Sequence, residues 1–293
     1  MITFASMKHL SILIPTYNDP CYMLVSDLQQ QASRLPISYE IIVADDGSKD
    51  QTVIEQNRHI NEIENCRVIE RGKNSGRAII RNYLAQQARY DWLLFIDSDM
   101  VVCRKDFVQR YAETEADVVD GGIIVGKTIE GNLRSMYEKA SEHQHTMEKR
   151  QLSPYKDFHT ANFLIRRDIM LAHPFDERFR CYGYEDVLVG KELQRHGIPI
   201  LHIDNPLSFE IYESNEAFVS KTEEGLRTLF TFRNELEGYS RLLAHREHLT
   251  GCSAFIRLFH RLFKDAERRN LCSDHPSLFV FNLYRLGYFF CLR

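Results

Sequence analysis

Residues 95–102, FIDSDMVV, place two aspartates, Asp97 and Asp99, one residue apart at the end of an apolar run. Carboxylates are costly to bury unless they are paired or bind a cation. Hard divalent cations such as Mg²⁺ and Mn²⁺ take oxygen ligands and are often shared between carboxylates and substrate phosphates. If the segment is extended, the two side chains point to opposite faces. We then expect one to bind a cation and the other to reach a sugar hydroxyl or a metal-bound water; a capped turn is the alternative.

A second acidic pair, Glu185 and Asp186, follows the aromatic and glycine-containing stretch 179–184, FRCYGY. A helix N-terminus favours carboxylates for electrostatic reasons alone, which is one explanation of the pair. The other explanation is catalytic. Gly183 would let the chain approach a ligand closely, and a carboxylate there could take a proton from an attacking hydroxyl.

Two further polar segments, 15–18 (PTYN) and 45–48 (DDGS), each follow an apolar run. Both compositions suit turns, with Asp or Ser capping a following helix. The functional alternative is a nucleoside pocket, in which Tyr17 stacks on a base. In that pocket Asp45 or Asp46 would accept the imide N–H of a pyrimidine or a ribose hydroxyl.

A third polar segment, 74–77 (NSGR), opens a helical pattern, and Arg81 follows one turn later. A solvated helix start would explain both Arg77 and Arg81. An arginine beside a helix N-terminus is also a natural partner for a diphosphate, because the guanidinium and the free N–H groups both attract anions.

The elements that must position these residues alternate along the chain. Apolar runs at 9–15, 40–44, 66–69, 91–96 and 117–125 predict strands, and segments near 21–35, 51–62 and 76–89 predict helices. Runs that are apolar on both faces are typical of a parallel sheet covered by helices, which predicts an α/β domain. The polar segments follow the predicted strands, and ligands bind at the carboxyl ends of strands in open α/β sheets.

The bulk composition limits the class of protein. A chain of 293 residues with 44% hydrophobic and 27% charged residues is an ordinary globular protein, and a net charge of −4 disfavours a general nucleic-acid binder. Seven scattered cysteines without a Cys-x-x-Cys pair predict a reducing, cytoplasmic setting rather than a disulfide framework or metal cluster. We find neither a signal peptide nor an apolar run of membrane-spanning length.

The C-terminal part differs from the rest. After about residue 215 the pattern is helical, and residues 239–293 contain nine basic and four acidic side chains. Within it, Phe255, Leu258, Phe259, Leu262 and Phe263 share one helical face. We expect this face to pack against the rest of the protein. The alternative is peripheral contact with an anionic membrane surface, such as the inner face of a cell membrane.

Five motifs in this order resemble family 2 glycosyltransferases over residues 9–210. They are SILIPTYN (11–18), IIVADDGS (41–48), NSGRAIIRN (74–82), FIDSD (95–99) and YGYED (182–186). The resemblance implies a GT-A fold, which is a Rossmann-like mixed, mainly parallel sheet flanked by helices. We expect this domain to span residues 1–212, followed by a helical C-terminal extension over residues 213–293.

The resemblance also implies roles. The donor would be a nucleotide-diphosphate sugar, most often a UDP-sugar, bound with Mn²⁺ or Mg²⁺. Asp99, with Asp97 beside it, would hold the metal, and Asp97 would also meet the ribose or the sugar. Asp186 matches the general base of an inverting displacement, and Glu185 would contact the acceptor or donor sugar. The donor-binding positions implied are Pro15, Thr16, Tyr17, Asn18, Asp45, Asp46, Asn74, Gly76, Arg77, Arg81, Asp97 and Ser98, with Pro15, Tyr17 and Asp46 at the base.

Two departures from the family pattern matter. Related sequences often place a metal-binding histidine after the last core strand, whereas residues 205–212 contain none, and Phe209 or Glu210 falls near that position. Metal binding would then rest on Asp99 and the diphosphate, or use Glu210, or be weak. The Gln-x-x-Arg-Trp motif of processive members is also absent. This favours transfer of a single sugar to a glycan or lipid-linked glycan over polymer synthesis.

Two other functions fit parts of the sequence. A non-catalytic relative that binds a nucleotide or a glycan would explain the missing histidine, although both acidic pairs are retained. A sugar nucleotidyltransferase also uses an α/β nucleotide-binding fold. It ranks lower because the N-terminal region has no glycine-rich phosphate loop with a basic residue.

Overall fold

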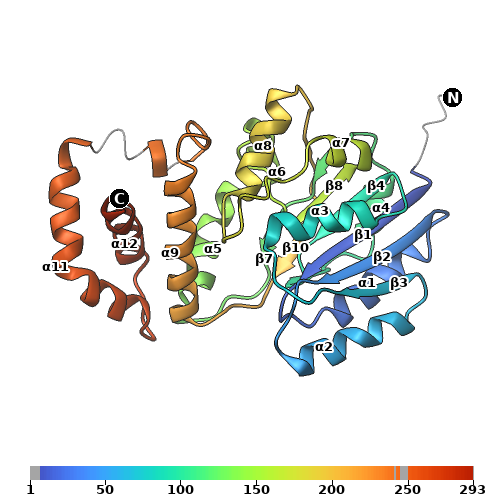
Figure 1. Ribbon diagram of the computed structural model, residues 1–293, viewed down its shortest axis with the longest axis horizontal. Coiled ribbons are helices and arrows are strands. Elements are labelled where there is room, and N and C mark those ends of the chain that lie inside the picture. The colour runs from blue at the N-terminus through green and yellow to red at the C-terminus, as the bar shows by residue number, and fades with distance from the viewer. Residues whose placement is uncertain (1–6, 241, 245–249, 293) are drawn as a thin grey trace.

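A computed structural model describes residues 7–240, 242–244 and 250–292. Its core is a seven-stranded sheet, drawn at the right of Figure 1. The strands lie in the order β3 (Cys66–Glu70), β2 (Ser38–Asp45), β1 (His9–Thr16), β4 (Trp92–Ile96), β8 (Asn162–Arg166), β6 (Val118–Asp120) and β9 (Leu201–His202). β1 pairs in parallel with β2 and β4, and β2 with β3, whereas β8 runs antiparallel to both its neighbours. The predicted α/β class and the first four predicted strands are confirmed.

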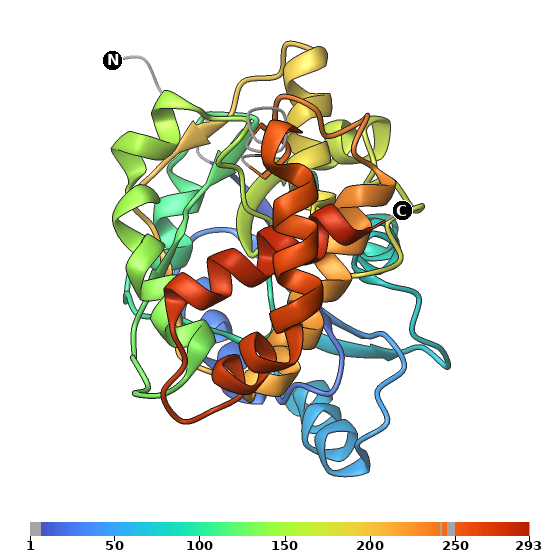
Figure 2. The same ribbon diagram turned by 90° about the vertical axis from the view of Figure 1, so that its left-hand side faces the viewer.

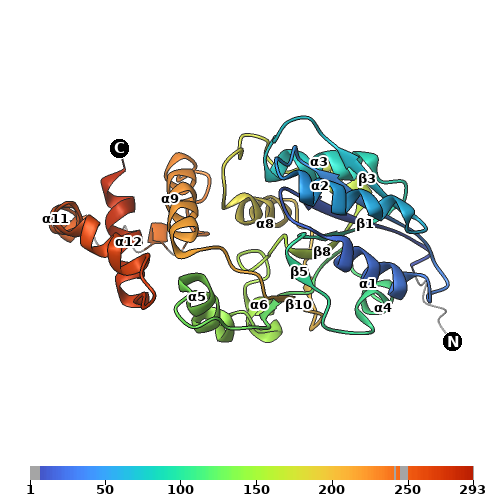
Figure 3. The ribbon, with the colours of Figure 1, turned by 90° about the horizontal axis from the view of Figure 1, so that it is seen from below.

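The buried runs of the central strands divide between two cores because successive side chains of a strand point to opposite faces. On β1, Leu10, Ile12 and Ile14 join the core covered by α1 (Tyr22–Ala32) and α4 (Phe107–Ala112). Leu13 joins the other core, which α3 (Arg77–Gln87) and α8 (Glu185–Arg195) cover. Figure 3 shows α1 and α3 on opposite sides of the sheet. Helices on both faces explain why these strands carry apolar side chains on both faces.

The predicted strand at 117–125 is wrong as a single element. It divides into β6 and β7 (Ile123–Val125), which belong to different sheets. β7 joins a three-stranded sheet in the order β5 (Met100–Val101), β10 (Leu207–Phe209), β7. The break is at Gly122, whose φ of +80° favours glycine and whose N–H donates to the Asp120 carboxylate (2.7 Å).

The other helices follow in chain order. The predicted helix at 51–62 forms as α2 (Gln51–Arg58) with a 3₁₀ turn at His59–Glu62, and those near 21–35 and 76–89 form with ends up to three residues inside the predicted bounds. The connection from β7 to β8 contains α5 (Leu133–Ser141), a 3₁₀ turn (Glu142–Gln144) and α6 (Met147–Leu152), and α7 (Arg167–Ala172) follows β8. The helical C-terminal part contains α9 (Asn215–Thr231), a 3₁₀ turn (Thr250–Cys252), α11 (Ser253–Leu271) and α12 (Leu278–Cys291).

α9 connects this helical part to the rest of the protein. Its residues Leu226 and Leu229 are buried in the same core as α3, while Phe218 packs with Leu133 of α5 and Phe281 of α12. Figure 2 shows α11 and α12 crossing each other as the outermost layer over α9. Within the described ranges, no helix has the length and apolar character needed to cross a membrane.

The expectation that the apolar face of α11 packs inward is wrong. Phe255 and Leu262 are 70% and 69% exposed, and Leu258 and Phe263 are also exposed. The side of α11 that packs is a different one, because it contains the buried residues His260, Glu267 and Leu271. The basic side chains Arg241, Arg246 and Arg293, counted in the charge of this segment, lie outside the described residues.

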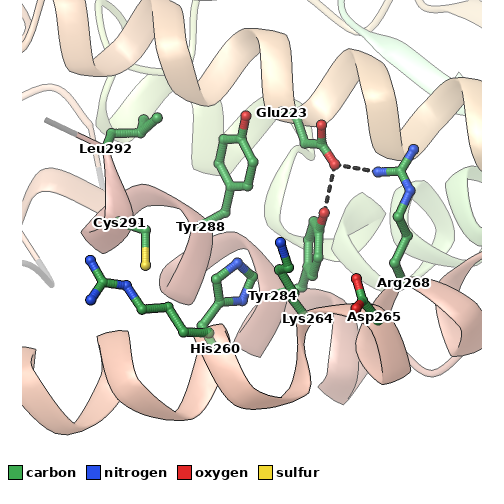
Figure 4. Close-up of a pocket in the computed structure, with 10 residues that line it drawn as sticks. Glu223, His260, Lys264, Asp265, Arg268, Tyr284, Tyr288, Cys291 and Leu292 are labelled. Carbon is green, nitrogen blue, oxygen red and sulfur yellow. Dashed lines mark hydrogen bonds and ion pairs between the residues drawn. The ribbon is translucent and has the colours of Figure 1, made fainter.

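Polar contacts hold α9, α11 and α12 together around a cavity of about 440 Å³ (Figure 4). The Glu223 carboxylate of α9 accepts the Tyr284 hydroxyl of α12 (2.5 Å) and also pairs with Arg268 of α11. On α11, His260 pairs with Glu267 at 2.7 Å. The contacts of Glu223 with Tyr284 and Arg268 fix the three helices relative to one another, which matters because α9 and α12 also border the site described next.

Candidate functional site

A cavity of about 910 Å³ opens at the carboxyl ends of β1, β2 and β4. It brings together four sequence segments predicted to bind a donor. The predicted residues that line it are Pro15, Thr16, Tyr17, Asn18, Asp46, Asn74, Gly76, Arg77, Arg81, Asp97, Ser98 and Asp99. We call it the donor cavity. Its position agrees with the rule that open α/β sheets bind ligands at these strand ends.

The end of β1 is fixed by hydrogen bonds to the chain that follows β2. The Asn18 side-chain oxygen accepts the N–H groups of Lys49 (2.7 Å) and Asp50 (3.1 Å), and its backbone N–H donates to the Ser48 hydroxyl. Asn18 has a φ of +56°, which asparagine tolerates better than most residues. The neighbouring residue Tyr17 lines the cavity and is 40% exposed.

The two aspartates after β2 have different environments. Asp46 lines the donor cavity, and its carboxylate accepts the backbone N–H groups of Ser75 (2.8 Å) and Gly76 (2.9 Å). It therefore fixes the loop that begins α3. Asp45 accepts the N–H of Ser48 (2.8 Å), and it is absent from the residues that line the donor cavity. Asp45 therefore fits the alternative in which it stabilises a turn and does not contact a ligand.

Residues 97–99 form a turn between β4 and β5 rather than an extended segment, and Met100 N–H closes it on the Asp97 carbonyl (3.2 Å). The expectation of opposite faces is therefore wrong, since Asp97 and Asp99 both line the donor cavity. Asp97 pairs with the fully buried Arg81 at 2.5 Å. Burial, followed by the negative charge of Asp97, raises the pKa of Asp99 to about 6.

The residues present fit a divalent cation with few protein ligands. Two crowded carboxylates, Asp97 and Asp99, repel each other, and a cation between them and a diphosphate would remove that repulsion. Across the described part of the chain no three His, Cys, Asp or Glu side chains form a metal cluster. The Glu210 carboxylate accepts a hydrogen bond from the Ser208 hydroxyl (2.8 Å), and Glu210 is not among the residues that line the donor cavity.

The sequence did not predict several charged residues of the donor cavity: Asp19, Arg134, Glu213 and Lys221. Asp19 directly follows the PTYN segment, which is a signal that could have found it. Arg134 and Lys221 come from α5 and α9, and Glu213 joins them with ion pairs of 2.5 and 3.2 Å. No motif identifies these three, because only the packing of α5 and α9 brings them to the cavity.

A second cavity of about 430 Å³ shares Arg77, Asp97 and Tyr182 with the donor cavity. We call it the acceptor cavity, after the role that we propose for it below. Asp186 and Glu185 line it at the start of α8. Other wall residues come from β7, from the segments 159–161 and 182–184, and from the helices α5, α9 and α12.

The chain approaches Asp186 through two residues in the left-handed region, Gly183 (φ +97°) and Tyr184 (φ +69°). A tyrosine in this region costs conformational energy, and such strain occurs most often at functional sites. Its consequence here is geometric. The sharp turn begins α8 at Glu185, so both carboxylates lie in the first turn of the helix and at the wall of the acceptor cavity.

The two acidic side chains have different partners. Glu185 is buried and lies 3.7 Å from Arg81 and 3.9 Å from Arg77. Asp186 accepts only the N–H of Val187 (2.8 Å) among the hydrogen bonds of the described residues. Burial, followed by the charge of Glu185, raises the pKa of Asp186 to about 7. A carboxylate with this pKa can accept a proton near neutral pH, as a general base requires.

Comparison with known proteins identifies the family of the chain. The family model "Glycosyl transferase family 2" matches residues 11–172, more than half of the chain. A Staphylococcus aureus poly(ribitol-phosphate) β-N-acetylglucosaminyltransferase, TarS, is 30% identical over 166 residues, which cover 53% of this chain and 28% of TarS. An uncharacterised glycosyltransferase of Haemophilus influenzae is 38% identical over 92 residues, covering 31% of this chain and 29% of that protein. The chain thus spans less than a third of the length of these relatives.

Two solved structures resemble the fold. The mannosyltransferase PcManGT of Pyrobaculum calidifontis, in complex with GDP-Man and Mn²⁺, has a TM-score of 0.56 at 12% identity and covers 98% of this chain and 86% of its own. S. aureus TarS has a TM-score of 0.53 at 18% identity over 90% of this chain and 47% of its own. Both support the GT-A fold. From the match to the family model and the fold, we conclude that the chain belongs to the family 2 glycosyltransferases.

Proposed function

We propose that the protein transfers one sugar from a nucleotide-diphosphate sugar, a UDP-sugar by family precedent, to a hydroxyl of a glycan or lipid-linked glycan. The observation that carries this proposal is the pair of adjoining cavities. The donor cavity contains Asp97 and Asp99, and the acceptor cavity contains Asp186, while Arg77 and Asp97 belong to both walls. A donor sugar at the shared wall would lie between its diphosphate and an acceptor hydroxyl.

Different residues of the donor cavity are suited to different parts of the donor. We propose that Pro15 and Tyr17 hold the base, while Asp46 holds the loop of Gly76 against it. Because Arg81 is already paired with Asp97, its role would be to orient that carboxylate.

We propose that the charge of the donor diphosphate is balanced by protein cations and a metal together. Asp97 and Asp99 would hold Mn²⁺ or Mg²⁺, which when bound would stabilise the charge on the departing diphosphate. The cations Arg77, Arg134 and Lys221 line the same cavity, and the Nε of Arg134 is buried with no hydrogen-bond partner in the described residues. In related proteins an additional ligand helps to hold the metal ion in place. Here Arg134 and Lys221 would supply part of the positive charge that such a metal ion provides.

The proposed chemical step is a single displacement. The acceptor oxygen attacks the anomeric carbon while Asp186 takes the hydroxyl proton. The bond from the anomeric carbon to the diphosphate oxygen breaks, and its electron pair leaves with the nucleoside diphosphate. One base on the side opposite the leaving group leads to inversion of configuration.

The experiment that tests the proposed function is a panel of UDP- and GDP-sugars with Mn²⁺ or Mg²⁺, scored by calorimetric binding and by slow donor hydrolysis. We expect binding of a UDP-sugar that Asp99→Ala weakens about tenfold or more, since a 1.4 kcal/mol loss is tenfold in affinity. The matched control is Asp204→Ala, because Asp204 is a largely exposed aspartate (71%) outside both cavities. Equal donor binding by wild type and Asp99→Ala would contradict the metal assignment. Binding without hydrolysis or transfer would favour the non-catalytic alternative.

We further propose that α11 rests on an anionic membrane surface. Its outward face contains Phe255, Leu258 and Leu262, all more than half exposed, and Arg257 and Arg261 are exposed on the same helix. Exposed apolar side chains with nearby basic ones are typical of helices that lie in the membrane interface. Such a position would bring the acceptor cavity close to lipid-linked acceptors.

Flotation with vesicles tests the membrane proposal. Wild type should float with vesicles rich in phosphatidylglycerol and less with phosphatidylcholine vesicles, because the basic residues attract anionic lipid. Leu258→Ser combined with Leu262→Ser should remove most of the binding. Leu152→Ser is the control, since Leu152 is 83% exposed on α6 and outside α11. Unchanged flotation of the double variant would contradict the proposal.

A further inference from the structure

The acceptor cavity contains a cation without an acidic partner. Arg285 of α12 is half-buried at the cavity wall, and its guanidinium donates to the Tyr137 hydroxyl (3.2 Å). The same guanidinium lies 5.3 Å from the centre of the Tyr137 ring and 5.5 Å from that of Phe281. Among the described residues, no carboxylate lies within ion-pair distance of Arg285. Two aromatic rings and a hydroxyl thus hold its position without neutralising its charge.

The other charged groups of this cavity have partners, with one exception. The ion pairs are Arg77 with Glu185 (3.9 Å), Asp97 with Arg81 (2.5 Å) and Glu138 with Arg134 (3.7 Å). The exception is Asp186, the proposed base. Because a base must lose its negative charge during the reaction, it is not a lasting partner for Arg285. The cavity therefore keeps one cation available for a charge that a ligand would bring.

The walls around Arg285 suit a sugar ring. Tyr137, Tyr184, Phe218 and Phe281 line the cavity and come from α5, the start of α8, α9 and α12. Aromatic rings provide apolar surface for the C–H faces of a sugar. The planar guanidinium of an arginine matches carboxylates and phosphates with two parallel hydrogen bonds, and the attraction is stronger where water is excluded.

We propose that the acceptor cavity binds a sugar with an anionic substituent, a carboxylate or a phosphate, that pairs with Arg285. The inference rests on the proposed function, because it requires that the acceptor hydroxyl reaches Asp186 in the same cavity. Arg285 is then a specificity-determining residue that contacts the acceptor away from the reacting atoms. A neutral acceptor would leave its charge without a partner in a partly desolvated site.

The test compares one hexoside in three forms: neutral, with a carboxylate at C6, and with a phosphate at C6. Transfer is measured as kcat/KM, and binding to the UDP-loaded protein is measured by saturation-transfer NMR, which also detects acceptors whose hydroxyl is wrongly placed for transfer. The variants are Arg285→Gln and Arg285→Lys. The matched control is Arg227→Gln, because Arg227 also pairs with a tyrosine, Tyr288, but is exposed on α9 and lines neither cavity.

For wild type we expect at least about a tenfold preference for one or both anionic forms over the neutral form. Arg285→Gln should remove the preference, Arg285→Lys should keep part of it, and Arg227→Gln should keep all of it. The carboxylate and phosphate forms, compared with each other, identify the substituent. No preference in wild type, or an unchanged preference in Arg285→Gln, would overturn the inference.

Hydrolysis of the donor separates this inference from the proposed function. A protein that binds and slowly hydrolyses a nucleotide sugar, but shows no preference for anionic acceptors, retains the proposed function and loses the inference. A protein that neither binds nor hydrolyses any donor loses the proposed function itself. Arg227→Gln, which lies outside both cavities, should hydrolyse the donor at the wild-type rate. Circular dichroism and the thermal midpoint, compared with those of wild type, show whether Arg285→Gln is folded.

Discussion

Replacing Asp186 with asparagine should lower the rate of sugar transfer by about 10²–10⁴-fold, the usual contribution of a positioned general base. Asparagine has nearly the same shape as aspartate and cannot accept a proton at neutral pH. Because Asp186 lines the acceptor cavity and not the donor cavity, donor affinity should change little. Release of nucleoside diphosphate in the presence of acceptor measures the first effect, and calorimetry with the donor measures the second.

The pH profile supplies a second readout of the same substitution. Burial and the charge of Glu185 raise the pKa of Asp186 to about 7. The base acts in its deprotonated form, so kcat/KM should rise with pH through about 7 and fall tenfold per unit below it. Glu192→Gln, a partly exposed residue of the same helix that lines neither cavity, should retain the wild-type rate and profile. Equal transfer by wild type and Asp186→Asn would eliminate Asp186 as the base.

Much of the sheet could be predicted because local sequence and tertiary environment agree there. The runs at 9–15, 40–44 and 91–96 are mostly apolar, and the structure buries most of their apolar side chains between two helical layers. The exception is 117–125, where the apolar pattern continues across Gly121 and Gly122 while the chain leaves one sheet and enters another. The spacing of apolar residues does not show this change of sheet, because the change depends on the hydrogen bond from the Gly122 N–H to the Asp120 carboxylate.

The site could be predicted where its residues are close in sequence to a strand end. That explains why Asn18, Asp46 and Asp99 reach one cavity, as the order of parallel strands requires. Arg134, Lys221 and Arg285 have no such position in the sequence. They reach the two cavities because α5, α9 and α12 pack together through Leu133, Phe218 and Phe281, and this long-range packing has no short motif.

The apolar face of α11 shows the opposite limitation. An amphipathic pattern predicts that a helix has two faces, but it does not say which face meets the protein. In the structure the packing side of α11 is occupied by the His260–Glu267 pair and by Leu271, and Phe255 and Leu262 point outward. Partners from α9 and α12 decide the orientation.

Replacing Arg150 with methionine should lower the free energy of unfolding by about 3–5 kcal/mol, the cost of breaking a buried ion pair from one side. The Arg150 and Asp120 side chains are 4% and 0% exposed and lie 2.8 Å apart. Asp120 also accepts the N–H groups of Gly122 and His159, so it holds the break between β6 and β7. Without the guanidinium, the Asp120 charge is left buried, and its pKa, already raised by burial, should rise further.

Urea denaturation with a constant m-value measures this loss as a lower midpoint. The matched control is Arg166→Met, which removes an arginine paired with Asp168 at the surface, where both side chains are largely exposed (45% and 62%) and such pairs contribute about 0–1 kcal/mol. Adding Asp120→Asn to Arg150→Met should restore part of the stability, because it removes the uncompensated charge. A midpoint for Arg150→Met equal to that of Arg166→Met would show that the buried pair contributes no more than a surface one. His159 lines the acceptor cavity, and its backbone N–H donates to Asp120. As the urea concentration rises, Arg150→Met should therefore lose acceptor binding at a lower concentration than donor binding.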